Sequence, residues 1–149
     1  MGQIRMDSSW FDARWGKSQQ PSDIRRQWER LGHLSQFLDE QERVLFEAVA
    51  EQGGGVGRLA RLTRRSPSSV SRQIRDIVRR LSGRELRMLL AHPDEFSGLE
   101  QACVREHLVR KRPLAQVARE LGTTVYEVRK TLSGIRAKTE RLCRVEQWP

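Results

Sequence analysis

Hydroxyl and charged side chains recur at helical spacing in two separate segments of the chain. Ser68, Ser69, Arg72 and Arg75 form the first group, and Tyr126, Glu127, Arg129, Lys130 and Ser133 form the second. Arginine donates two parallel hydrogen bonds to guanine, glutamate accepts from cytosine, and serine bonds to any base edge. The side chains of both groups are therefore predicted to face the base edges of a nucleic acid.

Further cations flank these two groups and are predicted to contact phosphates. They are Arg64, Arg65, Arg79 and Arg80 around the first group, and Arg110, Lys111, Arg112, Arg136 and Lys138 around the second. A charged helix face that only meets solvent is an equally good interpretation of any one arginine. The complete set, repeated in two segments, favours contact with DNA over that alternative.

The elements that must position these side chains are predicted from a pattern that occurs twice, 58 positions apart, at 59–81 and 117–139. Alignment of the copies pairs a small or apolar residue with its equivalent at four places: Ala60 with Ala118, Val70 with Val128, Ile74 with Leu132, and Ile77 with Ile135. A close helix crossing needs the alanine, and the second helix needs the apolar stripe. Each copy therefore predicts a helix-turn-helix whose second helix presents the polar groups.

Cap and turn residues support the same elements. Ser66 followed by Pro67 is typical of a helix start, and Asp39 with Glu42 resembles a capping box for an earlier helix. Gly122 suits the tight turn of the second copy, whereas the first copy has Arg64 at the equivalent position. The first copy is therefore expected to be the less regular of the two.

The predicted fold is all-α, with two tandem trihelical units that lack a wing, preceded by an N-terminal arm and helix. Residues 1–22 show no sustained period and are predicted to form a flexible arm. We expect the first unit at 23–91 and the second at 92–149, because His92-Pro93-Asp94 interrupts the helical pattern. The tail after Leu142 is expected to fray.

Composition agrees with a nucleic-acid partner, since the formal charge is +9 and the isoelectric point is about 10.9. No apolar stretch is long enough to span a bilayer, and no secretory signal is apparent, so a cytoplasmic, nucleoid-associated protein is expected. Cys103 falls on an apolar helical face and is predicted to be a core residue. The two cysteines lack partners at metal-binding spacing, so neither a metal nor another cofactor is predicted.

The second copy, residues 113–142, resembles region 4 of bacterial sigma-70-type factors, and the first copy resembles the same superfamily of helix-turn-helix domains. The resemblance covers roughly residues 39–142. It implies a helix-turn-helix that binds the promoter −35 element beside RNA polymerase, with base contacts at Tyr126, Glu127, Arg129 and Lys130. No segment resembles sigma region 2, so the resemblance implies a regulator more readily than a promoter-opening factor.

The leading hypothesis is a sequence-specific protein that binds double-stranded DNA and regulates transcription through both copies. One alternative is an adapter that contacts RNA polymerase and reads DNA with one unit only. Another is a DNA-binding protein of a phage or mobile element. An enzyme is not expected, because the histidines are scattered and the glycine run at 53–57 lacks the Gly-Lys-Ser/Thr ending of a phosphate-binding loop. The oligomeric state stays open.

Overall fold

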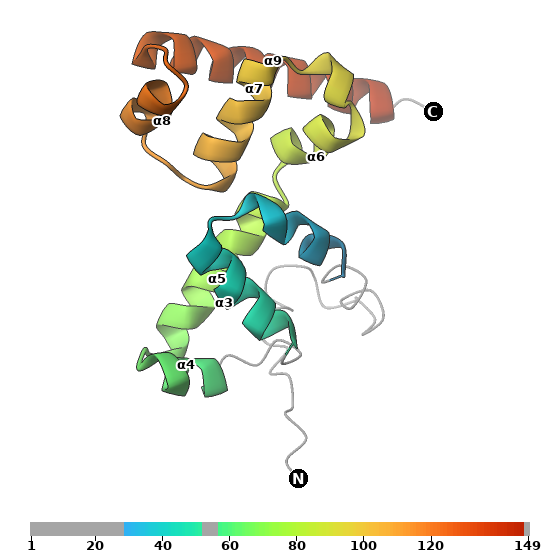
Figure 1. Cartoon of the computed structure of the whole chain (residues 1–149). Coiled ribbons are helices and arrows are strands. Elements are labelled where there is room, and N and C mark those ends of the chain that lie inside the picture. The colour runs from blue at the N-terminus through green and yellow to red at the C-terminus, as the bar shows by residue number, and fades with distance from the viewer. Residues whose placement is uncertain (1–28, 52–56, 148–149) are drawn as a thin grey trace. The chain divides into compact units, whose positions relative to one another are not determined.

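The computed structural model describes residues 29–51 and 57–147, and within these ranges every regular element is a helix (Figure 1). The predicted all-α class is therefore confirmed. The predicted arm at 1–22, the start of the helix that follows it and the glycine run lie outside or largely outside the described residues. The chain divides between Val78 and Arg79, inside one helix, into two compact units.

The first unit contains a helical stretch at 29–34 and then four elements: η1 (Ser35–Phe37), α3 (Glu40–Glu51), α4 (Gly57–Thr63) and α5 (Pro67–Leu81). Its core takes Phe46 and Val49 from α3, and Val70, Ile74 and Ile77 from α5; all five side chains are fully buried. The three-to-four-residue spacing of the apolar stripe in α5 is what allows one face of the helix to be buried.

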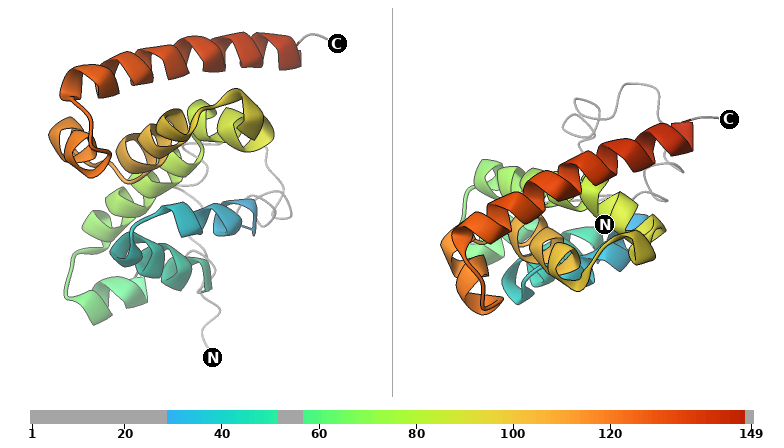
Figure 2. Two further views of the ribbon diagram at one scale, coloured as in Figure 1. Left: turned by 45° about the horizontal axis from the view of Figure 1, so that its top comes forward. Right: turned by 90° about the horizontal axis from the view of Figure 1, so that it is seen from above.

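The second unit contains α6 (Arg84–Ala91), η2 (Pro93–Glu95), α7 (Gly98–Cys103), η3 (Val104–Val109), α8 (Leu114–Glu120) and α9 (Val125–Gln147). η3 is a π-helical turn that continues directly from α7. The long helix α9 packs against α6, α7 and α8, and Figure 2 shows it as one unbroken helix with α8 beside its N-terminal end. The four core positions that the repeat predicted in this copy are buried: Ala118, Val128, Leu132 and Ile135.

The boundary between the units lies earlier than the sequence suggested. The prediction placed residues 84–91 in the first unit, but α6 packs on α9 and η3 and so belongs to the second. Leu86, Met88 and Leu89 form the buried face of α6. An apolar face of this kind can pack on either neighbour in the sequence, which is why the local pattern did not reveal its unit.

The structure extends the repeat far beyond the two helices seen in the sequence. With the same offset of 58 residues, η1 corresponds to η2, α3 to α7 plus η3, α4 to α8 within one residue, and α5 to the first part of α9. The buried Leu31, Leu38 and Phe46 correspond to the buried Leu89, Phe96 and Val104. Both units therefore share one succession of helices, although few residues are identical between them.

Hydrogen bonds at the helix starts repeat in the same way. Asp39 accepts from the N–H of Glu42 at 3.0 Å, as predicted, and Ser97 accepts from the N–H of Glu100 at 3.2 Å. Ser66 and Thr124 cap α5 and α9, and each accepts a bond of 3.2 Å from the N–H three residues later. These caps set where each helix begins.

The turn before the long helix has the same backbone geometry in both units. Arg65 N–H donates to the carbonyl of Ala60 at 2.9 Å, and Thr123 N–H donates to the carbonyl of Ala118 at 2.9 Å. The turn requires a left-handed residue, with φ of 54° at Arg64 and 65° at Gly122. This conformation is sterically strained for arginine, whereas glycine adopts it without strain.

Exchange of these two residue types is expected to change stability in opposite directions. Gly122→Ala should lower the free energy of unfolding by about 1 kcal/mol, since the added Cβ meets no atom within 4 Å and only backbone strain remains. Arg64→Gly should raise it by about 0.5–1 kcal/mol. Urea denaturation followed by circular dichroism measures both, and a loss of stability in Arg64→Gly would contradict the prediction.

The buried hydroxyl of Thr139 marks a second difference between the copies. Its side chain is fully buried, its Oγ1 has no hydrogen-bond partner, and the equivalent residue of the first copy is the buried Leu81. A buried hydroxyl without a partner costs about 1–3 kcal/mol of desolvation. Thr139 is therefore a weak point in an otherwise apolar stripe.

Thr139→Val is expected to raise the free energy of unfolding by about 1 kcal/mol, because it keeps the shape and removes the unpaired hydroxyl. Thr131→Val on the same helix is the matched control, since the Thr131 hydroxyl donates to the carbonyl of Glu127 at 2.7 Å. Thermal unfolding of both variants tests this. Equal effects at the two positions would show that the buried hydroxyl is not the cause.

The C-terminal tail is more ordered than predicted. α9 continues to Gln147 and Cys143 is buried, so the expectation that the chain frays after Leu142 was wrong for residues 143–147. Residues 148 and 149 of the predicted tail lie outside the described residues. α9 packs against α6, and tertiary packing of this kind stabilises a helix beyond what its local sequence favours.

Candidate nucleic-acid interface

The first turns of α9 present a row of polar side chains to solvent. Tyr126 is 70% exposed, and Glu127, Arg129, Lys130 and Ser133 are also exposed. Val128, Leu132 and Ile135 are buried beneath them. The helix therefore separates its two faces as the sequence predicted, and the five predicted residues lie on the outward side.

The equivalent surface of α5 is partly occupied by a turn residue. Ser68, Arg72 and Arg75 are exposed and Ser69 is half-buried. Arg65 donates from Nη2 to the hydroxyl of Ser69 at 3.0 Å and from Nη1 to the side chain of Gln73. The guanidinium thus lies along the helix face that was predicted to meet bases.

The cations predicted to contact phosphates divide into two sets. Those whose side chains are exposed are Arg64, Arg65, Arg79, Lys111 and Arg136. The other four are Arg80, Arg110, Arg112 and Lys138, which are less exposed and have intramolecular partners. These four cations, which were predicted to bind phosphates, therefore stabilise the second unit through intramolecular contacts.

Arg110 and Arg112 converge on one buried carboxylate. Nη1 of Arg110 lies 3.0 Å from Oε1 of Glu106, and Nη1 of Arg112 lies 3.0 Å from Oε2. Arg105 joins them, with its Nε 3.0 Å from Oε1. Glu106 is 6% exposed, so its charge is compensated by arginines rather than by water.

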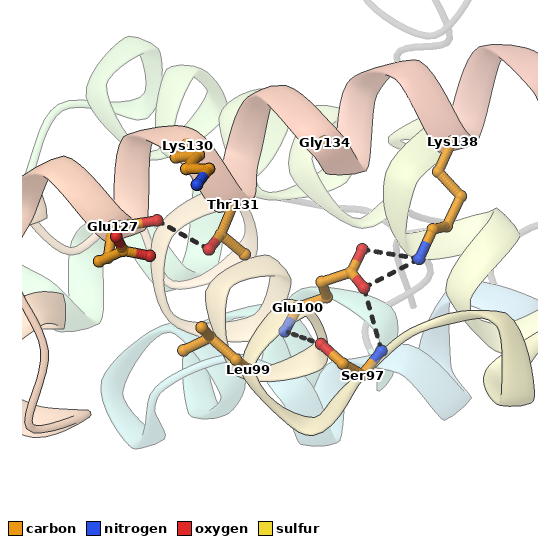
Figure 3. Close-up of a pocket in the computed structure, with 8 residues that line it drawn as sticks. All are labelled: Ser97, Leu99, Glu100, Glu127, Lys130, Thr131, Gly134 and Lys138. Atoms are coloured by element: carbon orange, nitrogen blue, oxygen red, sulfur yellow. Dashed lines mark hydrogen bonds and ion pairs between the residues drawn. The ribbon is translucent and has the colours of Figure 1, made fainter.

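Lys138 is directed back onto α7 rather than outward. Figure 3 shows its ammonium group at the carboxylate of Glu100, with N–O distances of 2.8 and 3.0 Å. The same nitrogen lies 5.2 Å from the centre of the Phe96 ring. Arg80 likewise turns inward and donates to the carbonyl of Val109 at the end of η3. Both side chains therefore support the fold.

The carboxylate of Glu100 stabilises the start of α7 in its charged form. Burial raises its pKa, but hydrogen bonds from Lys138 and Ser97 and the charge of Lys138 outweigh burial, so the pKa lies below its usual value. A lowered pKa means that this stabilisation is present at neutral pH. It is lost as the pH falls through the folded-state pKa.

A shallow groove of about 390 Å³ runs along α9 beside these residues (Figure 3). Its lining residues come from the start of α7 and the outward side of α9: Ser97, Leu99, Glu100, Glu127, Lys130, Thr131, Gly134 and Lys138. Glu127 and Lys130 thus lie at its edge as well as on the predicted reading face. Two carboxylates, of Glu100 and Glu127, and two ammonium groups, of Lys130 and Lys138, line the groove. Its charges therefore balance and do not favour binding of an anion.

Sequence reasoning missed Glu106 and Arg105. One signal was available, because Glu106 and Arg110 have the i, i+4 spacing of a helical ion pair. Nothing local indicated that the carboxylate would be buried, since that follows from the π-helical turn η3 and its packing on α6 and α8.

The remaining predictions concern residues outside the reading face. Cys103 is fully buried, as predicted, and burial followed by the charge of Glu100 raises the pKa of its thiol. Among residues 29–51 and 57–147, no group of three or more His, Cys, Asp or Glu is placed to hold a metal ion. No helix of the described ranges is long and apolar enough to cross a bilayer.

Comparison with known proteins gives no relative from which a role could be transferred: no family model, no curated protein and no solved structure matches this chain.

Proposed function

We propose that the chain is a non-enzymatic protein that binds double-stranded DNA and regulates transcription, with α9 as its main reading helix. The observation that carries the proposal is the exposed row Tyr126, Glu127, Arg129, Lys130 and Ser133 above a buried apolar stripe. In a helix-turn-helix the second helix enters the major groove with its first turns against base edges. The row occupies those turns of α9.

Each side chain of the row has a matching partner in the major groove. Arg129 and Lys130 donate to guanine or to phosphates, Glu127 accepts from the amino group of cytosine, and Ser133 bonds to either base edge. The exposed ring of Tyr126 offers an apolar edge to a thymine methyl group. The resemblance of residues 113–142 to sigma region 4 favours the same four contacts at 126, 127, 129 and 130.

Selection of bound sequences from a random duplex pool at moderate salt tests the proposal. We expect an enriched motif and an affinity that falls steeply as salt rises, because phosphate contacts release counterions. If both units read bases, the motif should be a direct repeat, since the two copies follow one another in the same orientation along the sequence. Absence of retention even at low salt would refute DNA binding.

A second candidate is the adapter, in which α9 reads DNA and the first unit contacts a protein such as RNA polymerase. The contacts of Arg65 with Ser69 and Gln73 favour it, because they cover part of the reading face of α5. Leu62 on α4 is 68% exposed, whereas its equivalent in the second copy is the charged Glu120. Such a residue suits a protein partner better than a phosphate backbone.

A further inference from the structure

Gly134 occupies an unfavourable position in α9 that the packing of the chain does not explain. It is exposed and lies in the interior of the helix, nine residues after Val125 and 13 before Gln147. Apart from proline, glycine is the least favourable residue in a helix interior, because it loses the most backbone entropy on folding. A Cβ placed on Gly134 would meet no atom within 4 Å, so no close contact among the described residues requires the missing side chain.

The first unit shows that the shared succession of helices does not require glycine at this place. With the offset of 58 residues, Gly134 corresponds to Asp76 of α5, and α5 buries its apolar stripe all the same. The backbone of Gly134 is ordinary helix, unlike that of Gly122, whose φ of 65° accounts for its residue type. Neither the fold nor the backbone conformation therefore accounts for the glycine at 134.

Gly134 lies in the shallow groove beside the row of α9 that is proposed to read bases. Figure 3 shows it on the stretch of α9 between Thr131 and Lys138, where it is one of the lining residues. Two other lining residues, Glu127 and Lys130, also belong to the row. Lys130 and Gly134 are four residues apart and therefore lie on the same side of the helix. A molecule that contacts the row thus passes beside the groove.

The dimensions of a DNA duplex make the flank of a reading helix important. The major groove of B-DNA is about 12 Å wide, and an α-helix with its side chains is about 10–12 Å across. A helix that enters the major groove therefore has one sugar-phosphate strand close to each flank. A side chain on a flank holds the helix away from the strand, whereas glycine narrows the helix at that point.

The groove suits the sugar of such a strand better than its phosphate. Its two carboxylates and two ammonium groups balance, so it has no net attraction for an anion. Leu99, which is 37% exposed, gives it an apolar wall. A deoxyribose ring is uncharged and carries C–H groups, which pack favourably against a leucine side chain and the bare backbone of a glycine.

We infer that Gly134 is a DNA-contact residue: because it has no side chain, a deoxyribose of one strand of the bound duplex enters the groove between α7 and α9 and contacts the helix backbone. The inference rests on the proposed function and deepens it. A contact of this kind reads no base but fixes the depth and orientation of α9 in the major groove. It thereby brings the row within hydrogen-bond distance of the base edges.

Gly134→Ala tests the inference, because it should change stability and DNA affinity in opposite directions. Alanine stabilises an exposed helix position, so the midpoint of thermal unfolding should rise by about 1–3 °C. The added methyl group should weaken binding to the duplex selected from the random pool roughly 5-fold, the lower end of the effect of an overfilled contact. Circular dichroism measures the first change and fluorescence anisotropy the second.

Gly32→Ala is the matched control. Gly32 is exposed in the helical stretch at 29–34, and a Cβ added there also meets no atom within 4 Å. It is not among the residues that line the groove. The control should therefore raise the unfolding midpoint and keep the wild-type affinity. Equal losses of affinity in the two alanine variants would overturn the inference, because they would make helix stiffness the cause.

Gly134→Leu separates a close contact from a need for helix flexibility. Alanine and leucine both remove the backbone freedom of glycine, so a need for flexibility predicts equal losses of affinity. A close contact predicts a graded loss, roughly 100-fold for leucine. Hydroxyl-radical footprinting, which reports the exposure of each deoxyribose, should show that the leucine variant no longer protects sugars of one strand that the wild-type protein protects.

Failure of the inference and failure of the proposed function are distinguishable. If the wild-type protein does not retain duplex DNA, the proposed function fails. If it binds and both Gly134 variants keep its affinity and its footprint, the contact at Gly134 is refuted while the reading role of α9 stands. If Gly134→Ala lowers the unfolding midpoint, the fold itself requires the glycine, and the inference is likewise refuted.

Discussion

Replacement of Arg129 and Lys130 together by alanine is expected to weaken duplex binding by roughly 30-fold or more. Each contact to a base edge or phosphate is worth about 1–3 kcal/mol, and both side chains project from the first turns of α9. Both are exposed, so their removal should leave the fold intact. Fluorescence anisotropy with a labelled duplex at fixed salt measures the loss.

The matched control is the double variant Arg141→Ala and Arg144→Ala on the same helix. It removes the same charge, but Arg141 follows Arg129 by 12 residues and Arg144 follows Lys130 by 14. These separations correspond to about 18–21 Å along the helix axis. We expect it to lower affinity only slightly, through the reduced net charge. Equal losses in the two double variants would mean that binding depends on charge alone, which would contradict a reading helix.

An arginine pair on the outward face of α5 decides between two readers and an adapter. If α5 reads DNA, Arg72→Ala with Arg75→Ala should weaken binding as strongly as the α9 pair and alter the selected motif. If only the α9 pair matters, the first unit does not read bases, and the adapter is favoured. The face of α5 that Arg65 covers leads us to expect the smaller effect there.

Glu106→Ala is expected to have the largest effect on stability, with a loss of about 3–5 kcal/mol in the free energy of unfolding. Removal of one partner from a buried ion pair leaves the others uncompensated, and here the carboxylate lies 3.0 Å from a nitrogen of each of three arginines. The alanine also leaves a space beside the π-helical turn η3. Urea denaturation followed by circular dichroism measures the change.

Glu120→Ala provides the comparison for this prediction. Glu120 also pairs with Arg112, and hydrogen bonds from Gln116 and Arg112 lower its pKa. Unlike the carboxylate of Glu106, that of Glu120 lies at the surface. An exposed ion pair is weakened by solvent and contributes little, so this variant should keep nearly wild-type stability. Similar losses at Glu106 and Glu120 would show that burial is not what makes Glu106 important.

Local sequence patterns were sufficient for the helices and their buried stripes. The spacing of Val70, Ile74 and Ile77, and of their equivalents in α9, depends only on 3.6 residues per turn and on the gain from burying apolar surface. Caps such as Ser66 and Asp39 act within three residues of themselves and are equally local. Helix positions, the all-α class and the outward row on α9 could therefore be predicted.

Tertiary packing decided which cations are available to a partner and which hold the fold. Lys138 pairs with Glu100 and Arg80 with the carbonyl of Val109, and both partners are distant in the sequence. A charged side chain does not reveal its partner through periodicity, because the partner lies on another helix. The assignment of α6 to the second unit was also decided by tertiary packing. Burial of its apolar face is favourable against any apolar surface, so the local sequence does not specify which unit the helix packs on.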